Sequence, residues 1–179
     1  MTEERTTATG PDSTLTYIDE TVIVFANNTY QFIVLREFDL PAGESLDDRD
    51  VLTALIANRH YRGSFVGTGD GDDTIHGNYQ VRAITAESFL PVSATDAESL
   101  LHTWAEYTSV LPDDVRTAIE RDVYPRINKA TAVFQLPKLP PEAWETEWRL
   151  ALGNATGFHE FVLIDRARGV VTLLIATDD

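Results

Sequence analysis

The sequence predicts an α+β domain built on a mainly antiparallel sheet of about six or seven strands, with about four helices packed on it. The strongest observation is the C-terminal run FHEFVLIDRARGVVTLLIA at residues 158–176, in which two β-rich segments flank a short turn and so indicate a hairpin. In both segments the two alternating sets of side chains are largely apolar. We therefore expect this hairpin at the centre of a sheet that is covered on both faces.

A second hairpin is predicted at the N-terminal end. Three apolar and β-branched runs follow one another there, at residues 15–18, 21–26 and 29–38. Asn27 and Asn28 separate the last two runs, and Asn tolerates the left-handed backbone that two-residue turns need. The break at Asp19 and Glu20 fits either a turn or a bulge within one long strand.

Helical spacing of apolar residues, acidic first turns and Pro or Gly boundaries predict four helices, at about residues 47–62, 96–110, 112–125 and 140–152. Thr95 and Glu98 form a capping box at the start of the second helix. Pro125 is expected to end the third. Between the helices we expect strands at 64–66 and 79–85, paired as a hairpin, and at 130–136.

The N-terminal strands are also apolar on both sides, so the predicted sheet needs a covering layer on each face. Either the four helices divide between the two faces, or helices cover one face and a second copy of the chain covers the other. We favour the second arrangement, which predicts a homodimer.

The chain is strongly acidic, with 29 Asp and Glu against 14 Lys and Arg in 179 residues and a net charge of −15. The excess negative charges repel one another, and this repulsion is screened at about 1 M salt, where the Debye length is about 3 Å. Acid excess, scarce lysine and abundant threonine resemble the proteins of salt-accumulating halophilic microbes. The same charge disfavours sequence-independent binding of nucleic acid, which needs a basic surface.

Residues 1–13 are polar and rich in Thr and Glu, which predicts a disordered acidic tail before a single domain at residues 14–179. The chain has no cysteine, so disulfides, thiolate metal sites and thiol nucleophiles are excluded. No apolar run approaches the length of a membrane span, and no secretion signal is visible. We expect a cytoplasmic protein without membrane contact.

The one local motif is the acidic glycine-rich run GTGDGDDTIHG at residues 67–77. Residues 69–77 resemble one unit of the calcium-binding nonapeptide repeat of RTX-type proteins, in which Asp oxygens hold calcium between stacked repeats. The resemblance covers nine residues, and this chain has a single such unit. Clustered oxygens also suit hard cations in general, so Asp70, Asp72 and Asp73, with His76, are candidate ligands for Ca²⁺ or Mg²⁺. The alternative is an acidic hairpin loop.

The densest positive patch is the run Arg59-His60-Tyr61-Arg62. One interpretation is an anion site, in which Arg59 or Arg62 binds a carboxylate or phosphate and His60 titrates near neutral pH. The other is a helix C-terminus carrying cations, for which the helix dipole is a sufficient cause.

No nucleophile elbow, phosphate-binding loop or histidine metal motif is present. His159 and Glu160 are adjacent in a predicted strand and so point to opposite faces, which disfavours an acid/base pair. We therefore favour a non-catalytic binding, regulatory or self-associating module. The alternative is a divalent-metal-dependent hydrolase or phosphoryl-transfer enzyme, which requires the acidic loop and Arg59 to Arg62 to meet in one cleft. A four-residue strand would separate the ends of these segments by roughly 13 Å.

Overall fold

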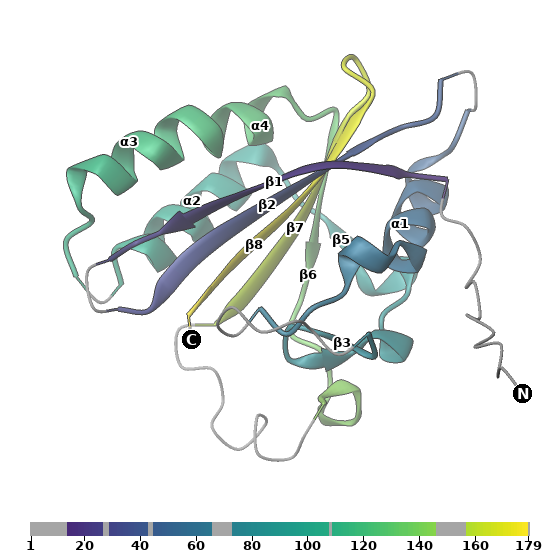
Figure 1. The fold of residues 1–179 in the computed structure, drawn as a ribbon, viewed down its shortest axis with the longest axis horizontal. Coiled ribbons are helices and arrows are strands. Elements are labelled where there is room, and N and C mark those ends of the chain that lie inside the picture. Colours follow the sequence, from purple (N-terminus) through teal and green to yellow (C-terminus); the bar gives the residue numbers. More distant parts are fainter. Residues whose placement is uncertain are drawn as a thin grey trace, which may run out of the picture.

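The computed structural model describes residues 14–26, 29–42, 45–65, 73–107, 109–145 and 157–178. Its centre is a six-stranded antiparallel sheet in the order β1-β2-β8-β7-β6-β5 (Figure 1). The strands of this sheet are β1 (Thr16–Val24), β2 (Gln31–Asp39), β5 (Leu90–Pro91), β6 (Ala132–Leu136), β7 (Phe158–Asp165) and β8 (Val170–Asp178). A separate short ladder pairs β3 (Ile75–His76) with β4 (Tyr79–Gln80). The predicted α+β class with a mainly antiparallel sheet is confirmed.

The predicted C-terminal and N-terminal hairpins are present. Strands β7 and β8 form the central pair of the sheet, and Gly169 in their turn has a φ of 66°, which glycine adopts without strain. Strands β1 and β2 form the N-terminal hairpin. The register of β1 shifts between Tyr17 and Asp19, so the break near Asp19 is a bulge within one strand. The predicted turn residues Asn27 and Asn28 lie outside the described residues.

Three of the four predicted helical regions are helices: α1 (Asp48–Ala57), α2 (Ala94–Ala105), and a third region divided into α3 (Asp113–Asp122) and α4 (Tyr124–Lys129). Helix α2 is capped by Ser93, whose side chain accepts from the Asp96 amide, and Thr95 lies inside the helix. Pro125 lies in the first turn of α4 instead of ending a helix, because its missing N–H costs nothing in a first turn. In the fourth region the described residues contain only a 3₁₀ turn, Pro141–Ala143.

The short strands were predicted less well. Residues 64 and 65 form no strand, and Gly63 instead makes a single bridge to His76. The expected strand at 79–85 stops at Gln80 and continues as a 3₁₀ turn, Val81–Ala83.

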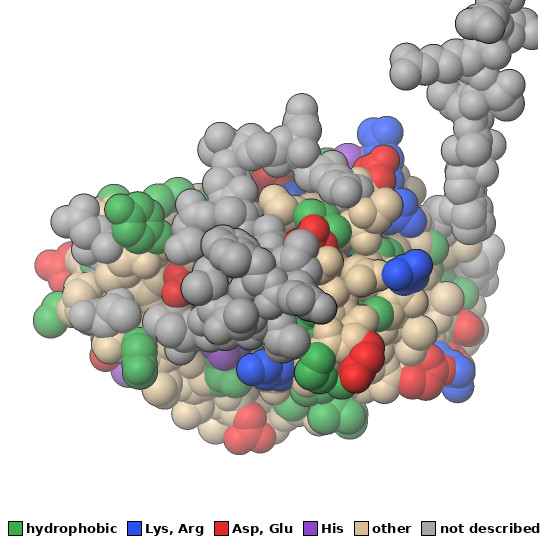
Figure 2. All heavy atoms as spheres, turned by 90° about the horizontal axis from the view of Figure 1, so that it is seen from below, with side chains coloured by type: hydrophobic (Ala, Val, Ile, Leu, Met, Phe, Trp, Pro, Cys, Tyr) green, Lys and Arg blue, Asp and Glu red, His purple; other side chains and the backbone are tan. Residues whose placement is uncertain are grey.

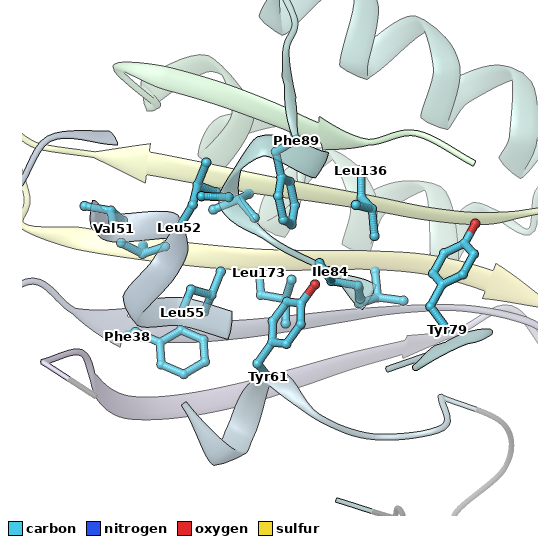
Figure 3. Close-up of a cluster of buried hydrophobic side chains, with 14 of the residues drawn as sticks. Phe38, Val51, Leu52, Leu55, Tyr61, Tyr79, Ile84, Phe89, Leu136 and Leu173 are labelled. Carbon is cyan, nitrogen blue, oxygen red and sulfur yellow. The ribbon is translucent and has the colours of Figure 1, made fainter. Parts of the chain in front are cut away.

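The chain covers both faces of its own sheet. On one face α1 and the segments around Tyr61, Tyr79 and Phe89 pack on inward residues of the strands, as Figure 3 shows. On the other face α2, α3 and α4 pack on the alternate residues of the same strands. Leu173 and Leu174, neighbours on β8, therefore lie in different hydrophobic clusters, and neither is exposed.

The helices and turns thus divide between the two faces, and the arrangement in which a second copy covers one face is wrong. The homodimer prediction loses the observation on which it was based. The predicted tail, residues 1–13, lies outside the described residues. Within the described chain, no helix combines the length and the apolar character that a bilayer crossing needs.

Candidate functional site

A pocket of about 500 Å³ lies beside the N-terminal half of β1. Its lining is mostly charged and combines all three residues of the predicted anion site with residues from β1 and β2: Tyr17, Glu20, Arg36, Arg59, His60, Arg62 and Asp73. Three arginines on one pocket are unusual in a chain that carries a net charge of −15.

The segment from Arg59 to Arg62 is separate from the helix before it. Helix α1 ends at Ala57, has no basic residue in its last turn, and gives way at Asn58 to a 3₁₀ turn, Arg59–Tyr61. The buried Asn58 side chain holds this turn, since it accepts from the His60 amide (3.0 Å) and donates to the Leu15 carbonyl (2.8 Å). Arg59 and His60 therefore lie just beyond the last turn of α1, in a turn of their own.

Arg36 on β2 fixes the same segment from the sheet. Its guanidinium donates to the carbonyls of His60 (2.7 Å) and Arg62 (3.1 Å) and forms an ion pair with Glu20 (2.5 Å). It also lies over the ring of Phe65, 4.9 Å from the ring centre. Arg36 is thus largely satisfied by the protein itself, and it holds the backbone from which Arg59 and Arg62 extend.

Arg59 and Arg62 form no ion pair within the described part of the chain. The Nε atom of Arg62 is buried and, among the described residues, has no hydrogen-bond partner. Within the described ranges, Arg59 donates only to the ring of His60, at 3.1 Å. Most other described arginines pair with a carboxylate: Arg36, Arg49, Arg116, Arg121, Arg126 and Arg166. The pocket therefore offers two positive charges that the described part of the fold leaves without a counter-ion.

His60 lies flat against Tyr17, with ring centres 3.9 Å apart and an angle of 10° between the rings. Partial burial lowers the pKa of His60, and the positive charges of Arg59 and Arg36 lower it further. The Arg59 side chain donates to His60 Nε2, so this nitrogen is the unprotonated acceptor. Near pH 7 His60 is therefore neutral, and an anion in the pocket would favour its protonated form.

Beneath the pocket lies a fully buried polar cluster of Tyr61, His76 and Glu160. The Tyr61 hydroxyl donates to Glu160 Oε1 (2.9 Å), and His76 Nε2 bonds to Glu160 Oε2 (2.8 Å). His76 Nδ1 bonds to the Tyr61 carbonyl at 2.5 Å, and the two rings stack with centres 3.7 Å apart. Burial, followed by the charge and hydrogen bond of Glu160, raises the pKa of Tyr61 well above its usual range.

Aromatic rings enclose this cluster. Phe65 and Phe158 meet the His76 ring edge-on, with centres 5.2 Å and 5.7 Å away. Gly77 has a φ of 55°, and a Cβ there would come within 2.3 Å of the Phe158 ring. The three side chains are buried, and their hydrogen bonds hold Tyr61 in place between Arg59 and Arg62.

The predicted metal residues are only partly described. Asp73 is exposed and lines the pocket, whereas Asp70 and Asp72 lie outside the described residues. His76 is buried with both ring nitrogens engaged, which leaves neither directed to a cation in this arrangement. Among the described residues no group of three or more metal-binding side chains occurs.

The sequence analysis missed Arg36, and it considered Glu160 only as a partner of His159. Arg36 contacts residues 24 and 26 positions away, and Glu160 contacts residues 84 and 99 positions away. The available signal was a charged residue inside an apolar strand in each case. His159 lies on the opposite side of β7 from Glu160 and faces Trp104, as the alternation of strand residues predicts.

Comparisons of the chain with protein-family models, with curated proteins and with solved structures find no match. A function for this chain therefore has to be argued from the pocket geometry.

Proposed function

We propose that this protein is a non-catalytic binding module for a small polyvalent anion, a carboxylate or a phosphate, held by Arg59 and Arg62 with His60 as a titratable third contact. The single observation that carries the proposal is that, among the described residues of an acid-rich chain, Arg59 and Arg62 have no ion pair. Carboxylates and phosphates suit the forked guanidinium, which can donate two parallel hydrogen bonds.

Calorimetric titration with sulfate, pyrophosphate and citrate tests this proposal, at the lowest KCl concentration that keeps the protein folded. We expect saturable binding of at least one anion, weakened about tenfold or more in Arg59→Gln and in Arg62→Gln. Arg168→Gln is the matched control, because Arg168 is exposed in the β7–β8 turn and the substitution removes the same charge. Equal weakening in the control, or no saturable binding in the wild type, would overturn the proposal.

A second candidate function is a divalent-metal-dependent hydrolase or phosphoryl-transfer enzyme. What favours it is Asp73, which lines the same pocket as Arg59, His60 and Arg62, the juxtaposition that this function requires. Titration with Ca²⁺, Mg²⁺ and Mn²⁺, on the wild type and on a variant carrying Asp72→Asn and Asp73→Asn, tests it. Binding that is absent, or is unaffected by the substitutions, would leave the enzyme hypothesis without support.

The net charge of −15 supports a further part of the proposal, that the module works in the cytoplasm of a salt-accumulating microbe. A thermal melting series from about 0.1 to about 3 M KCl checks the salt requirement. We expect the midpoint to rise with salt, and a midpoint that stays constant or falls would count against this setting.

A further inference from the structure

The two edges of the six-stranded sheet are built differently. One edge is β5, which has two residues and includes Pro91. Short strands and proline are the usual means by which proteins keep an edge from pairing with another chain. The other edge is β1, which has nine residues and, among the described strands, pairs only with β2.

The N-terminal half of β1 is also protected. A bulge interrupts its register between Tyr17 and Asp19. Immediately after the bulge, the Glu20 amide donates to the Asp19 side chain at 2.8 Å, so that amide is not available to another strand. Bulges and charged side chains are recognised devices for blocking edge pairing.

The C-terminal half of β1 has no such protection among the described residues. The Phe25 amide donates to the Gln31 carbonyl of the neighbouring strand at 3.0 Å. Successive residues of an antiparallel strand direct their backbone groups alternately toward and away from the partner. The amides and carbonyls of Val22 and Val24 therefore point away from β2, and we call Val22 to Val24 the open edge.

At the open edge the side chains of Val22 and Val24 are exposed, whereas Ile23 is buried. Val22 is 48% exposed and Val24 is 63% exposed, and the run from Thr21 to Ala26 contains no charge. Further exposed apolar side chains lie just before β2 and in the connection between α2 and α3: Tyr30, Tyr107 and Val110. Figure 1 shows the start of β2 and this connection at the same end of the molecule. Hydrophobic side chains are visible at this end of the surface in Figure 2. Exposed apolar side chains at an uncharged strand edge of an acidic protein indicate an interaction surface.

We propose that a second copy of the chain occupies the open edge, with the two β1 strands paired antiparallel about Ile23. In this register Val22 lies opposite Val24 of the second copy, so the outward amides and carbonyls of both residues are satisfied. The sequence Val22-Ile23-Val24 is symmetric in size and polarity, which suits pairing with itself. Glu20 falls opposite Ala26 of the second copy, which keeps the acidic halves of the two strands apart.

Alternative registers are less favourable for physical reasons. Moving the axis to Val22 places Glu20 opposite Val24 and requires the Glu20 amide, which Asp19 already occupies. Moving the axis by half a residue sets side chains of opposite faces against each other. The pairing about Ile23 doubles the six-stranded sheet without changing either protomer.

Salt should control this association. Each copy carries a net charge of −15. The pairing of Val22 and Val24 with their counterparts supplies four interstrand hydrogen bonds, an interface that is small compared with that of a permanent dimer. Screening of the mutual repulsion is therefore required, so the dimer forms at high salt and dissociates at low salt. The proposal does not depend on the anion pocket.

The absence of cysteine in the chain permits a direct test of the register. Opposed residues in such a pair have Cα atoms about 5.5 Å apart, which is within the range that a disulfide bridges. An equimolar mixture of Val22→Cys and Val24→Cys proteins, oxidised in about 3 M KCl, is expected to give a mixed disulfide dimer as its main product. Leu90→Cys, on the protected edge and 53% exposed, is the matched control.

Sedimentation velocity across a KCl series, on the wild type and on Val24→Lys, completes the test. We expect the dissociation constant to fall at least about tenfold between about 0.5 and about 3 M KCl, and to rise at least about tenfold in the lysine variant. A wild-type protein that stays monomeric at every salt concentration would overturn the proposal. Cross-linking no greater than that of Leu90→Cys would do the same, and efficient cross-linking of Val22→Cys alone would overturn the register about Ile23.

Discussion

The two sides of the segment from Arg59 to Arg62 differ in whether their polar and charged groups have partners. On the inner side, Tyr61 meets Glu160 and His76 in a cluster with no exposed side chain and with partners for its hydrogen-bonding groups. On the outer side, Arg59 and Arg62 face a pocket of about 500 Å³ and have no carboxylate partner among the described residues. Buried polar groups that are fully satisfied make a structure specific, whereas charges left unpaired at a pocket are available to a ligand. The inner side supports the fold, and the outer side is the candidate for function.

The largest effect is expected from Glu160→Ala. Removing this carboxylate leaves the Tyr61 hydroxyl and one nitrogen of His76 buried without partners. Loss of one member of such a buried network costs about 3 to 5 kcal/mol of unfolding free energy. Chemical denaturation in high KCl measures it, with Glu160→Gln as the control that keeps the shape and part of the bonding. A loss below about 1 kcal/mol would mean that the inner cluster does not hold the fold.

A smaller loss is expected from Gly77→Ala. The added Cβ would meet the Phe158 ring at 2.3 Å, and the φ of 55° is unfavourable for alanine. We expect a loss of about 2 kcal/mol in the same denaturation experiment. Gly169→Ala is the control, because its φ is also positive but no atom lies within 4 Å of the added Cβ. Equal losses in the two variants would show that backbone strain, and not contact with the cluster, is responsible.

Tyr61→Phe isolates the phenol of the inner cluster. We expect a loss of about 1 to 2 kcal/mol near pH 7, because the Glu160 carboxylate loses a donor. The pKa of Tyr61 is raised in the folded state, so its contribution is complete below the unfolded value of about 10 and is lost as the pH rises above it. The variant is therefore expected to lose less stability than the wild type as the pH rises above about 10. Identical alkaline slopes would contradict the assignment.

The smallest effect on stability, and a distinct effect on binding, is expected from His60→Gln. Burial and the neighbouring arginines lower the pKa of His60, so anion binding takes up a proton and sulfate affinity rises as the pH falls below neutrality. Sulfate suits the experiment because it does not itself titrate in this range. The variant is expected to bind sulfate with little dependence on pH and to unfold within about 0.5 kcal/mol of the wild type. A pH dependence that persists in the variant would assign the proton to another group.

Prediction from the sequence succeeded where the pattern is local. The β7–β8 hairpin and the β1–β2 hairpin each follow from alternation and turn residues within a few positions, whereas the break near Asp19 was left open between a turn and a bulge. Strand β5 was missed because a strand of two residues is too short to show an alternating pattern. Pro125 was predicted at the end of a helix, although it lies at the start of one, because proline is common at both helix boundaries.

The candidate site was predictable only in part. Arg59, His60 and Arg62 are adjacent in the sequence, and their shared pocket follows from that adjacency. The contribution of Arg36 and the burial of His76 depend on strand order and on contacts across the sheet, which no local pattern encodes. Asp70 and Asp72 lie outside the described residues, so their part in a metal site stays a prediction.

The strand order also determines when the protein can fold during synthesis. Strand β2 lies between β1 and β8, and its residue Ile33 pairs with Ala176, so the inner edge of the first hairpin has no partner until β8 has been made. Pairings of such long sequence separation slow folding and leave apolar strands open to aggregation in the meantime. In the nascent chain the first hairpin thus keeps an unpaired apolar strand edge until the last strand is made, and shortening β8 is expected to leave the protein in that state.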